Sequence, residues 1–235
     1  MFKAQSPLAD ELAKIREHTR EHERLLLCHH FQFDLPLNVQ DDASSGPSEQ
    51  SKYVVIGINP GEIVGDHRCE GPTEESSEFD FHATLDGRDD IRWTRALRRI
   101  LPTCSVFQSQ LFFWSSNDAA QLCDRLGHKL ERATTHLQFC RDMNRRMIEV
   151  RSPDAVILAS MGQSTRVQEL YGLTEMQVPL DNSRLRANGR DRLVRVFSDA
   201  QKRPWIAVPH LTSCRPPLIE NEVAVIRQVI QSYTP

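Results

Sequence analysis

Three polar side chains stand where runs of apolar, β-branched residues stop, and such runs are typical of buried strands. These side chains are Asn59, Asn117 and His210. Pro and Gly follow Asn59 and force a sharp turn, so its amide would project from the strand end with a donor and an acceptor. Fixed polar groups of this kind can orient a water molecule and stabilise developing negative charge, which hydrolysis requires. An ordinary strand-to-turn junction uses the same Asn-Pro-Gly residues, and this alternative stays open here.

Short buried strands alternate with helices along the chain. Strands are expected at residues 53–58, 106–114, 155–159 and 205–209, the last of them paired in a hairpin with 193–198. Helices are expected at residues 6–27, 91–100, 119–126, 130–150, 164–172 and 219–230. This alternation predicts an α/β fold with a parallel sheet between helices. Sites in such sheets lie just beyond the carboxyl ends of the strands, where the polar side chains stand.

The segment Val55-Ile56-Gly57-Ile58-Asn59-Pro60-Gly61 resembles the first active-site motif of the uracil-DNA glycosylase superfamily, most closely that of its mismatch-specific uracil/thymine branch. The resemblance implies a three-layer α/β/α sandwich with a central, four-stranded, mainly parallel sheet. It also implies that Asn59 positions the water that attacks the sugar C1′, and that Gly57 and Ile58 line the base-binding pocket.

Further roles follow from the same resemblance. His210 would close the fourth strand and donate a hydrogen bond to the uracil O2, although Leu211-Thr212 replaces the Pro expected after it. Asn117 would read the edge of the base, and Phe81, in preference to Phe79, would stack on it. Ser213 and Arg215 would contact the nucleic-acid backbone, although residues 213–217 could equally lead into the last helix, with Arg215 as a solvated charge.

These residues predict a DNA glycosylase that hydrolyses the N-glycosidic bond of uracil or a related damaged base. Its partner would be uracil-containing or mispaired DNA, or single-stranded DNA, because the base must leave the stack. A superfamily member without catalysis, which binds a nucleobase, nucleic acid or protein through the same cleft, is the first alternative. A Rossmann-like nucleotide-binding enzyme is a weaker alternative, because the chain lacks a glycine-rich phosphate loop.

Length and charge bound the organisation of the molecule. The 235 residues are interpreted as a single domain, 1–235, in which residues 1–52 form a helix and a polar loop. Residues 62–90 carry ten acids and two arginines and are expected to form an acidic loop beside the site. Such a loop would repel phosphate, whereas residues 184–203, with seven bases and two acids, could attract it. The net charge of −3 hides this asymmetry.

Composition argues against several other classes. No apolar run approaches the roughly 20 residues that span a bilayer, and no apolar signal core follows Met1, so a cytoplasmic protein without membrane contact is expected. The six cysteines form no C-x-x-C pair. The trio Cys28-His29-His30 and the set His67, Cys69 and His82 lack a characteristic metal-site pattern. The sequence therefore predicts a monomer without metal or cofactor, with His18 and His22 on a polar helix face.

Overall fold

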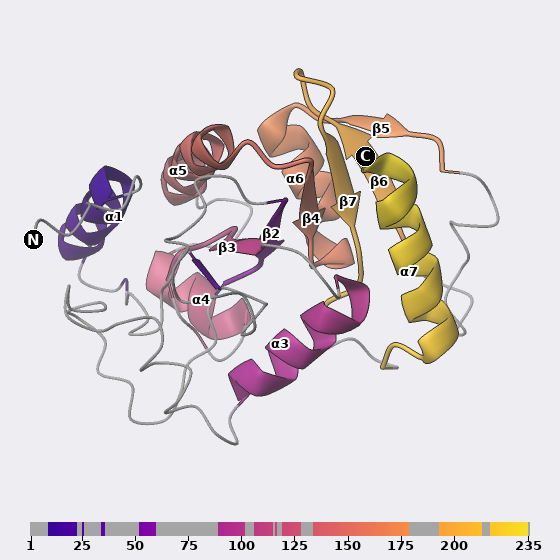
Figure 1. Cartoon of the computed structure of the whole chain (residues 1–235). Helices are drawn as coiled ribbons and strands as arrows, with labels where there is room; N and C mark the ends of the chain where they lie inside the picture. The colour runs from indigo at the N-terminus through magenta and orange to yellow at the C-terminus, as the bar shows by residue number, and fades with distance from the viewer. Residues whose placement is uncertain are drawn as a thin grey trace, which may run out of the picture.

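The chain forms a mixed β-sheet with helices packed against both of its faces (Figure 1). This arrangement is seen in a computed structural model, which describes residues 9–22, 25, 34–35, 52–59, 89–101, 106–114, 116, 119–127, 134–178, 193–212 and 217–234. The α/β class predicted from the sequence is confirmed.

Seven strands make up the sheet, in the order β1-β3-β2-β4-β7-β6-β5. They are β1 (Asp34–Leu35), β2 (Tyr53–Gly57), β3 (Val106–Gln110), β4 (Ala155–Leu158), β5 (Thr174–Met176), β6 (Arg195–Ser198) and β7 (Pro204–Ala207). The central strands β3, β2, β4 and β7 are parallel. The outer strands β1, β6 and β5 each pair antiparallel to their neighbours. The sheet is therefore wider than the four strands expected, and the predicted hairpin of β6 and β7 is confirmed.

Alternate residues of the central strands enter two separate cores. Val54 and Ile56 of β2 belong to one cluster of buried side chains, and Tyr53 and Val55 belong to the other. Because successive side chains of a strand point to opposite faces, a strand that is apolar at every position must be covered on both sides. The continuous run Tyr53–Gly57 is buried at all positions for this reason.

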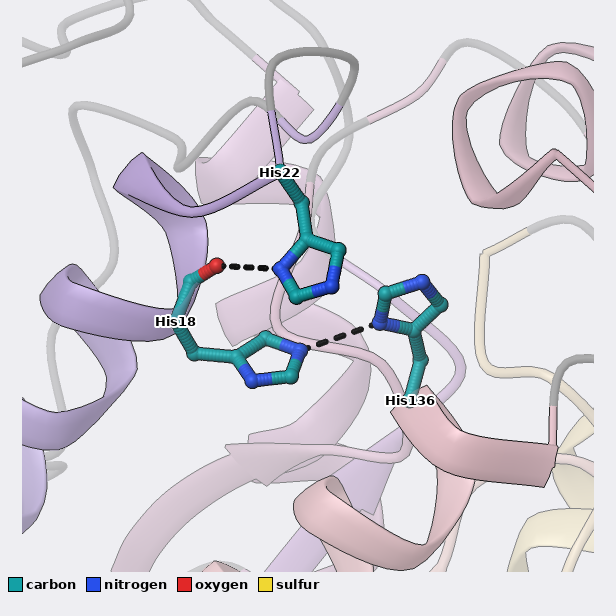
Figure 2. Close-up of side chains that lie close together, drawn as sticks. All are labelled: His18, His22 and His136. Carbon is teal, nitrogen blue, oxygen red and sulfur yellow. Dashed lines mark hydrogen bonds between the residues drawn. The ribbon is translucent and has the colours of Figure 1, made fainter.

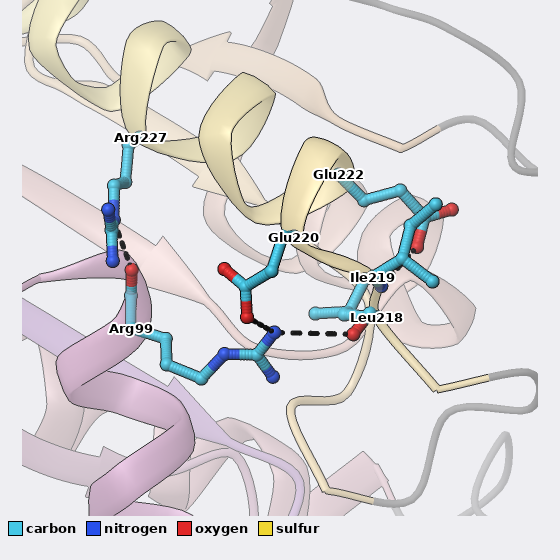
Figure 3. A network of polar contacts seen from close by, with 6 residues as sticks. All are labelled: Arg99, Leu218, Ile219, Glu220, Glu222 and Arg227. Carbon is cyan, nitrogen blue, oxygen red and sulfur yellow. Dashed lines mark hydrogen bonds and ion pairs between the residues drawn. The ribbon is translucent and has the colours of Figure 1, made fainter.

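One face is covered by α3 (Asp89–Ile100) and α7 (Glu220–Tyr233), which contact each other. A polar network joins them: Arg99 donates to Glu220 at 2.8 Å and to the carbonyl of Leu218 at 3.4 Å (Figure 3). Arg227 of α7 donates back to the carbonyl of Arg99. The ion pair of Arg99 with Glu220 is largely exposed, so the apolar side chains beneath it contribute most of the stability of this layer.

The other face is covered by α1 (Ala9–Arg20), α4 (Ala119–Leu126), α5 (Thr134–Arg151) and α6 (Ser164–Tyr171), the last preceded by a short 3-10 turn at Met161–Gln163. A buried polar contact fixes α5 to the sheet. Asn144 of α5 accepts a hydrogen bond from Ser109 of β3 at 2.5 Å and donates one to the carbonyl of Gln110 at 2.9 Å. The contact sets the position of α5 relative to the carboxyl end of β3.

Several element boundaries differ from the sequence prediction. The strand predicted over 106–114 ends at Gln110, and the N–H groups of Leu111 and Phe112 in the buried segment that follows donate to the carbonyls of Gly57 and Ile58. Helix α1 ends at Arg20 rather than near residue 27. Helix α3 begins at Asp89, inside the stretch expected to be an acidic loop. The bounds of α4 agree with the prediction.

Candidate functional site

Asn59 and His210 follow two parallel strands at the same edge of the sheet. Asn59 comes two residues after β2 ends at Gly57, and His210 comes three residues after β7 ends at Ala207. Strand β4 lies between β2 and β7, so the two backbones are separated by about 10 Å, twice the usual strand spacing. At that separation the two side chains are placed to contact opposite sides of one small ligand rather than each other.

The amide of Asn59 is held in one orientation by the segment that follows β3. Its Nδ2 donates to Ser116 Oγ at 2.9 Å and to the carbonyl of Trp114 at 3.4 Å. A backbone carbonyl can only accept, so the amide nitrogen must face it and Oδ1 must face the other way. Both Ser116 and Trp114 are buried, which makes this support rigid. The half-buried Asn59 therefore presents an oriented acceptor.

Gly57 allows the side chain of Gln110 to lie against the end of β2. The two residues are paired across β2 and β3, and a Cβ atom at Gly57 would overlap Gln110 Oε1. This Oε1 is buried and has no hydrogen-bond partner within the part of the chain that the structure describes. An unpartnered buried acceptor is costly, and a ligand that donates a hydrogen bond would satisfy it. Ile58, the next residue, is half-buried and accepts a backbone bond from Phe112 at 2.8 Å.

His210 is half-buried and has a defined tautomer. The backbone N–H of Thr212 donates to its Nδ1 at 3.4 Å, which leaves the proton of the neutral ring on Nε2. Burial lowers the pKa of His210 below its ordinary value, so the ring is neutral at pH 7. His210 is therefore arranged as a neutral hydrogen-bond donor through Nε2.

The structure brings together part of the predicted site. Gly57, Ile58, Asn59 and His210 are at one edge of the sheet. Four other predicted residues lie outside the described residues: Phe81, Asn117, Ser213 and Arg215. Sequence reasoning missed Gln110 and Ser116. Gln110 gave a weak signal as one of three consecutive polar residues, 108–110, within the predicted strand, whereas Ser116 gave none.

A cavity of about 280 Å³ lies at the other edge of the sheet, near the turn between β6 and β7. Asp199 and Arg203 line it, and they form an ion pair at 3.6 Å. Asp199 also accepts from the backbone of Gln201 and from Trp205 Nε1. Because Asp199 is fully engaged in holding this turn, the cavity offers less for chemistry than the Asn59 edge.

Comparisons with known proteins give no further assignment. No protein-family model matches the sequence, and no curated protein matches it. Among the described residues, no helix has both the length and the apolar character needed to cross a bilayer.

Proposed function

We propose that this chain is a DNA glycosylase of the uracil-DNA glycosylase type, which hydrolyses the N-glycosidic bond of uracil or a related damaged base. The observation that carries the proposal is the pairing of an oriented acceptor, Asn59 Oδ1, with a neutral donor, His210 Nε2, at one edge of a parallel sheet. The four parallel strands between helices are also consistent with the sandwich that the resemblance implies.

The reaction needs both kinds of group. As the glycosidic bond breaks, the sugar gains positive charge and the base gains negative charge. The Nε2–H of His210 would stabilise the charge on a base oxygen, and a neutral imidazole does so without a counter-charge that must be desolvated. Asn59 Oδ1 would accept a hydrogen bond from water and orient it toward C1′. Asn59 is not a base, so its contribution is positioning rather than proton removal.

The remaining parts of the proposal concern substrate and setting. The target base would leave the DNA stack to reach Asn59 and His210, which favours mispaired or single-stranded DNA because unstacking is cheapest there. Gln110 Oε1, against Gly57, would accept a hydrogen bond from the edge of the base. We propose a cytoplasmic monomer that acts on DNA.

The test is cleavage of an oligonucleotide that carries one uracil, single-stranded or opposite guanine, followed by alkali. We expect strand cleavage with the wild-type protein. Asn59→Ala should lower the single-turnover rate about 100-fold, and His210→Ala about 100- to 1,000-fold. Asn221→Ala, which removes an exposed asparagine of α7, is the matched control and should cleave normally. No cleavage by the wild-type protein at stoichiometric amounts contradicts the glycosylase proposal.

A catalytically inactive member that binds a nucleobase through the same cleft is the second candidate. Gln110 Oε1, which has no hydrogen-bond partner among the described residues, favours it equally, because a bound donor would satisfy this acceptor without any reaction. Under this alternative, the wild-type protein does not cleave DNA, yet uracil raises its melting temperature and Gln110→Ala removes the shift. If neither cleavage nor a shift is observed, the cleft is not the functional surface.

A further inference from the structure

Three histidines from two segments far apart in the sequence meet on the face of the sheet covered by α1 and α5. His18 is in the last turn of α1, His22 follows four residues later, and His136 is in the first turn of α5. Figure 2 shows their rings facing one another. One ring nitrogen from each lies within 4.8 Å of the other two, and all three side chains are half-buried.

The hydrogen bonds of the three histidines show which ring nitrogens have a lone pair that could bind a metal ion. His22 Nδ1 donates to the carbonyl of His18 at 2.8 Å, so the neutral ring of His22 has its lone pair on Nε2. This contact of a histidine with a backbone carbonyl is the kind that orients metal-binding imidazoles. His18 Nε2 and His136 Nδ1 are 3.0 Å apart and share one hydrogen bond, so at least one of them has a lone pair.

The spacing of the rings suits one ion. Zinc–nitrogen bonds of 2.0–2.1 Å place tetrahedral ligands about 3.3–3.4 Å apart. The 3.0 Å between His18 and His136 needs only a few tenths of an ångström of opening to reach that value. The i, i+4 spacing of His18 and His22 brings two imidazoles to one side of a helix end, as in helical zinc sites.

Two aromatic side chains, Phe139 and Trp114, pack against the ring of His18. Its ring stacks on Phe139 at 4.0 Å between centroids and on Trp114 at 5.4 Å. Burial, and then the proximity of His22 and His136, lower the pKa of His18 to about 4. The expected polar, solvated face at His18 and His22 is not what the structure shows.

We infer that His18, His22 and His136 bind a single divalent transition-metal ion of the zinc class, which joins the end of α1 to the start of α5. Three imidazoles, with no carboxylate in the cluster among the residues that the structure describes, select zinc, cobalt, nickel or copper over magnesium and calcium. Three protein ligands also leave a coordination position for water. The site is separate from the proposed cleft, but Trp114 connects the two: its ring stacks on His18 and its carbonyl accepts from Asn59.

The experiment uses the full chain without a histidine tag, stripped of metal by a chelator. Titration with Co²⁺ should give visible d–d absorption at one equivalent, without the thiolate charge-transfer band that Cys123 or Cys140 would add. Isothermal titration with Zn²⁺ should also give one equivalent, and Zn²⁺ should raise the melting temperature. Mg²⁺ should produce neither effect.

His136→Ala and His22→Ala should each weaken Zn²⁺ binding at least about 100-fold. Mutation of a residue that only hydrogen-bonds a metal ligand already lowers metal affinity about 10- to 100-fold, and these two residues would bind the ion directly. His210→Ala is the matched control. It removes a histidine that lies three residues beyond the end of β7 and outside the cluster, and it should bind Zn²⁺ normally. Equal binding by wild-type and His136→Ala proteins, or no binding by the wild type, overturns the inference.

X-ray absorption of the zinc-loaded wild type keeps the test independent of whether the variants fold. Imidazole nitrogens at 2.0–2.1 Å support the site, and a shell of sulfur ligands or of oxygen alone overturns it. Because every readout is metal binding, the result does not depend on glycosylase activity.

Discussion

Asn59 depends on two buried atoms of another segment for its orientation. Trp114 and Ser116 follow β3, yet they hold a side chain that follows β2. Their acceptors bind the amide nitrogen, so rotation of the amide would break two hydrogen bonds. This support is what separates a positioning residue from an asparagine that merely ends a strand.

Gly57 is expected to be required because of Gln110. An alanine at position 57 would force the Gln110 amide to move, since its Cβ would overlap Oε1 and lie 3.2 Å from Cδ. We expect Gly57→Ala to destabilise the fold by about 1 kcal/mol, the low end of the cost of overpacking, because the overlapped atom is the end of a flexible side chain. Urea denaturation measures it.

The same substitution in a Gln110→Ala background provides the control. With the Gln110 side chain removed, Gly57→Ala should be neutral or slightly stabilising, because alanine loses less backbone entropy than glycine on folding. An equal cost in both backgrounds would show that the backbone, and not Gln110, excludes a side chain here.

His210 should make stability depend on pH. Its pKa is about 6.5 in the unfolded chain and lower in the folded protein because of burial. Below pH 6.5 the unfolded state therefore binds a proton that folded His210 binds less readily, and the free energy of unfolding falls as the pH falls. The difference in unfolding free energy between wild type and His210→Gln should be constant above this pH and change below it. If the unfolding free energies of the two proteins change in parallel from pH 7.5 to pH 5, the lowered pKa of His210 is contradicted.

The sequence placed some site residues and could not place others. Asn59 was predictable because a β-branched run stops at Asn-Pro-Gly, which fixes a strand end locally. Gln110 and Ser116 were not, since their roles depend on the register between β2 and β3, which local pattern does not encode. The approach of His18 to His136, 118 residues away, depends on how two helices pack and gave no local signal.

At the scale of elements, α1 is fixed by a chain of hydrogen bonds as well as by apolar packing. Trp114 Nε1 donates to Thr19 Oγ1 at 2.9 Å, and Thr19 donates to the carbonyl of Ile15 at 2.6 Å. Trp114 is fully buried, so its indole N–H has no access to water. Thr19 thus couples the position of α1 to the segment that supports Asn59.

Removal of this acceptor should be costly. Thr19→Val keeps the shape of the side chain but leaves Trp114 Nε1 without its partner, and we expect a loss of about 1–3 kcal/mol. Thr19→Ser retains the hydroxyl and should cost clearly less. Urea denaturation followed by circular dichroism measures both, and equal losses would show that α1 is held by packing alone.

Element boundaries were predictable where they depend on local chemistry. Helix α6 ends before Gly172, which adopts the left-handed conformation that glycine favours at a helix end. The end of β3 was missed because the apolar run continues to Trp114, and burial alone does not distinguish a strand from a buried extended segment.

At the scale of the molecule, the sheet has a parallel centre and antiparallel margins. The centre is covered on both faces, as its continuous apolar strands require. The marginal strands β1 and β5 contain two and three residues, and so short a segment shows no periodicity that a sequence pattern could reveal. Strand β5 is exposed at every position, so its own burial contributes little to holding it.

Arg195 of β6 holds the exposed strand β5 through its side chain. It pairs with Glu175 of β5 through two hydrogen bonds of 2.9 and 3.0 Å, and it donates to Ser164 at the start of α6 at 2.7 Å. A lysine cannot form the forked pair and reach Ser164 together. We expect Arg195→Lys to increase hydrogen exchange in β5 about 5-fold, which corresponds to ~1 kcal/mol for a partly exposed pair.

Exchange in β2 and β4 should stay unchanged in this variant, because global unfolding rather than opening of the margin limits exchange in the centre. Arg99→Lys, which alters the exposed pair with Glu220 on the opposite face, is the matched control and should leave β5 as in the wild type. If Arg195→Lys accelerates exchange equally in β5 and β4, the sheet opens as one unit and its margin is no weaker than its centre.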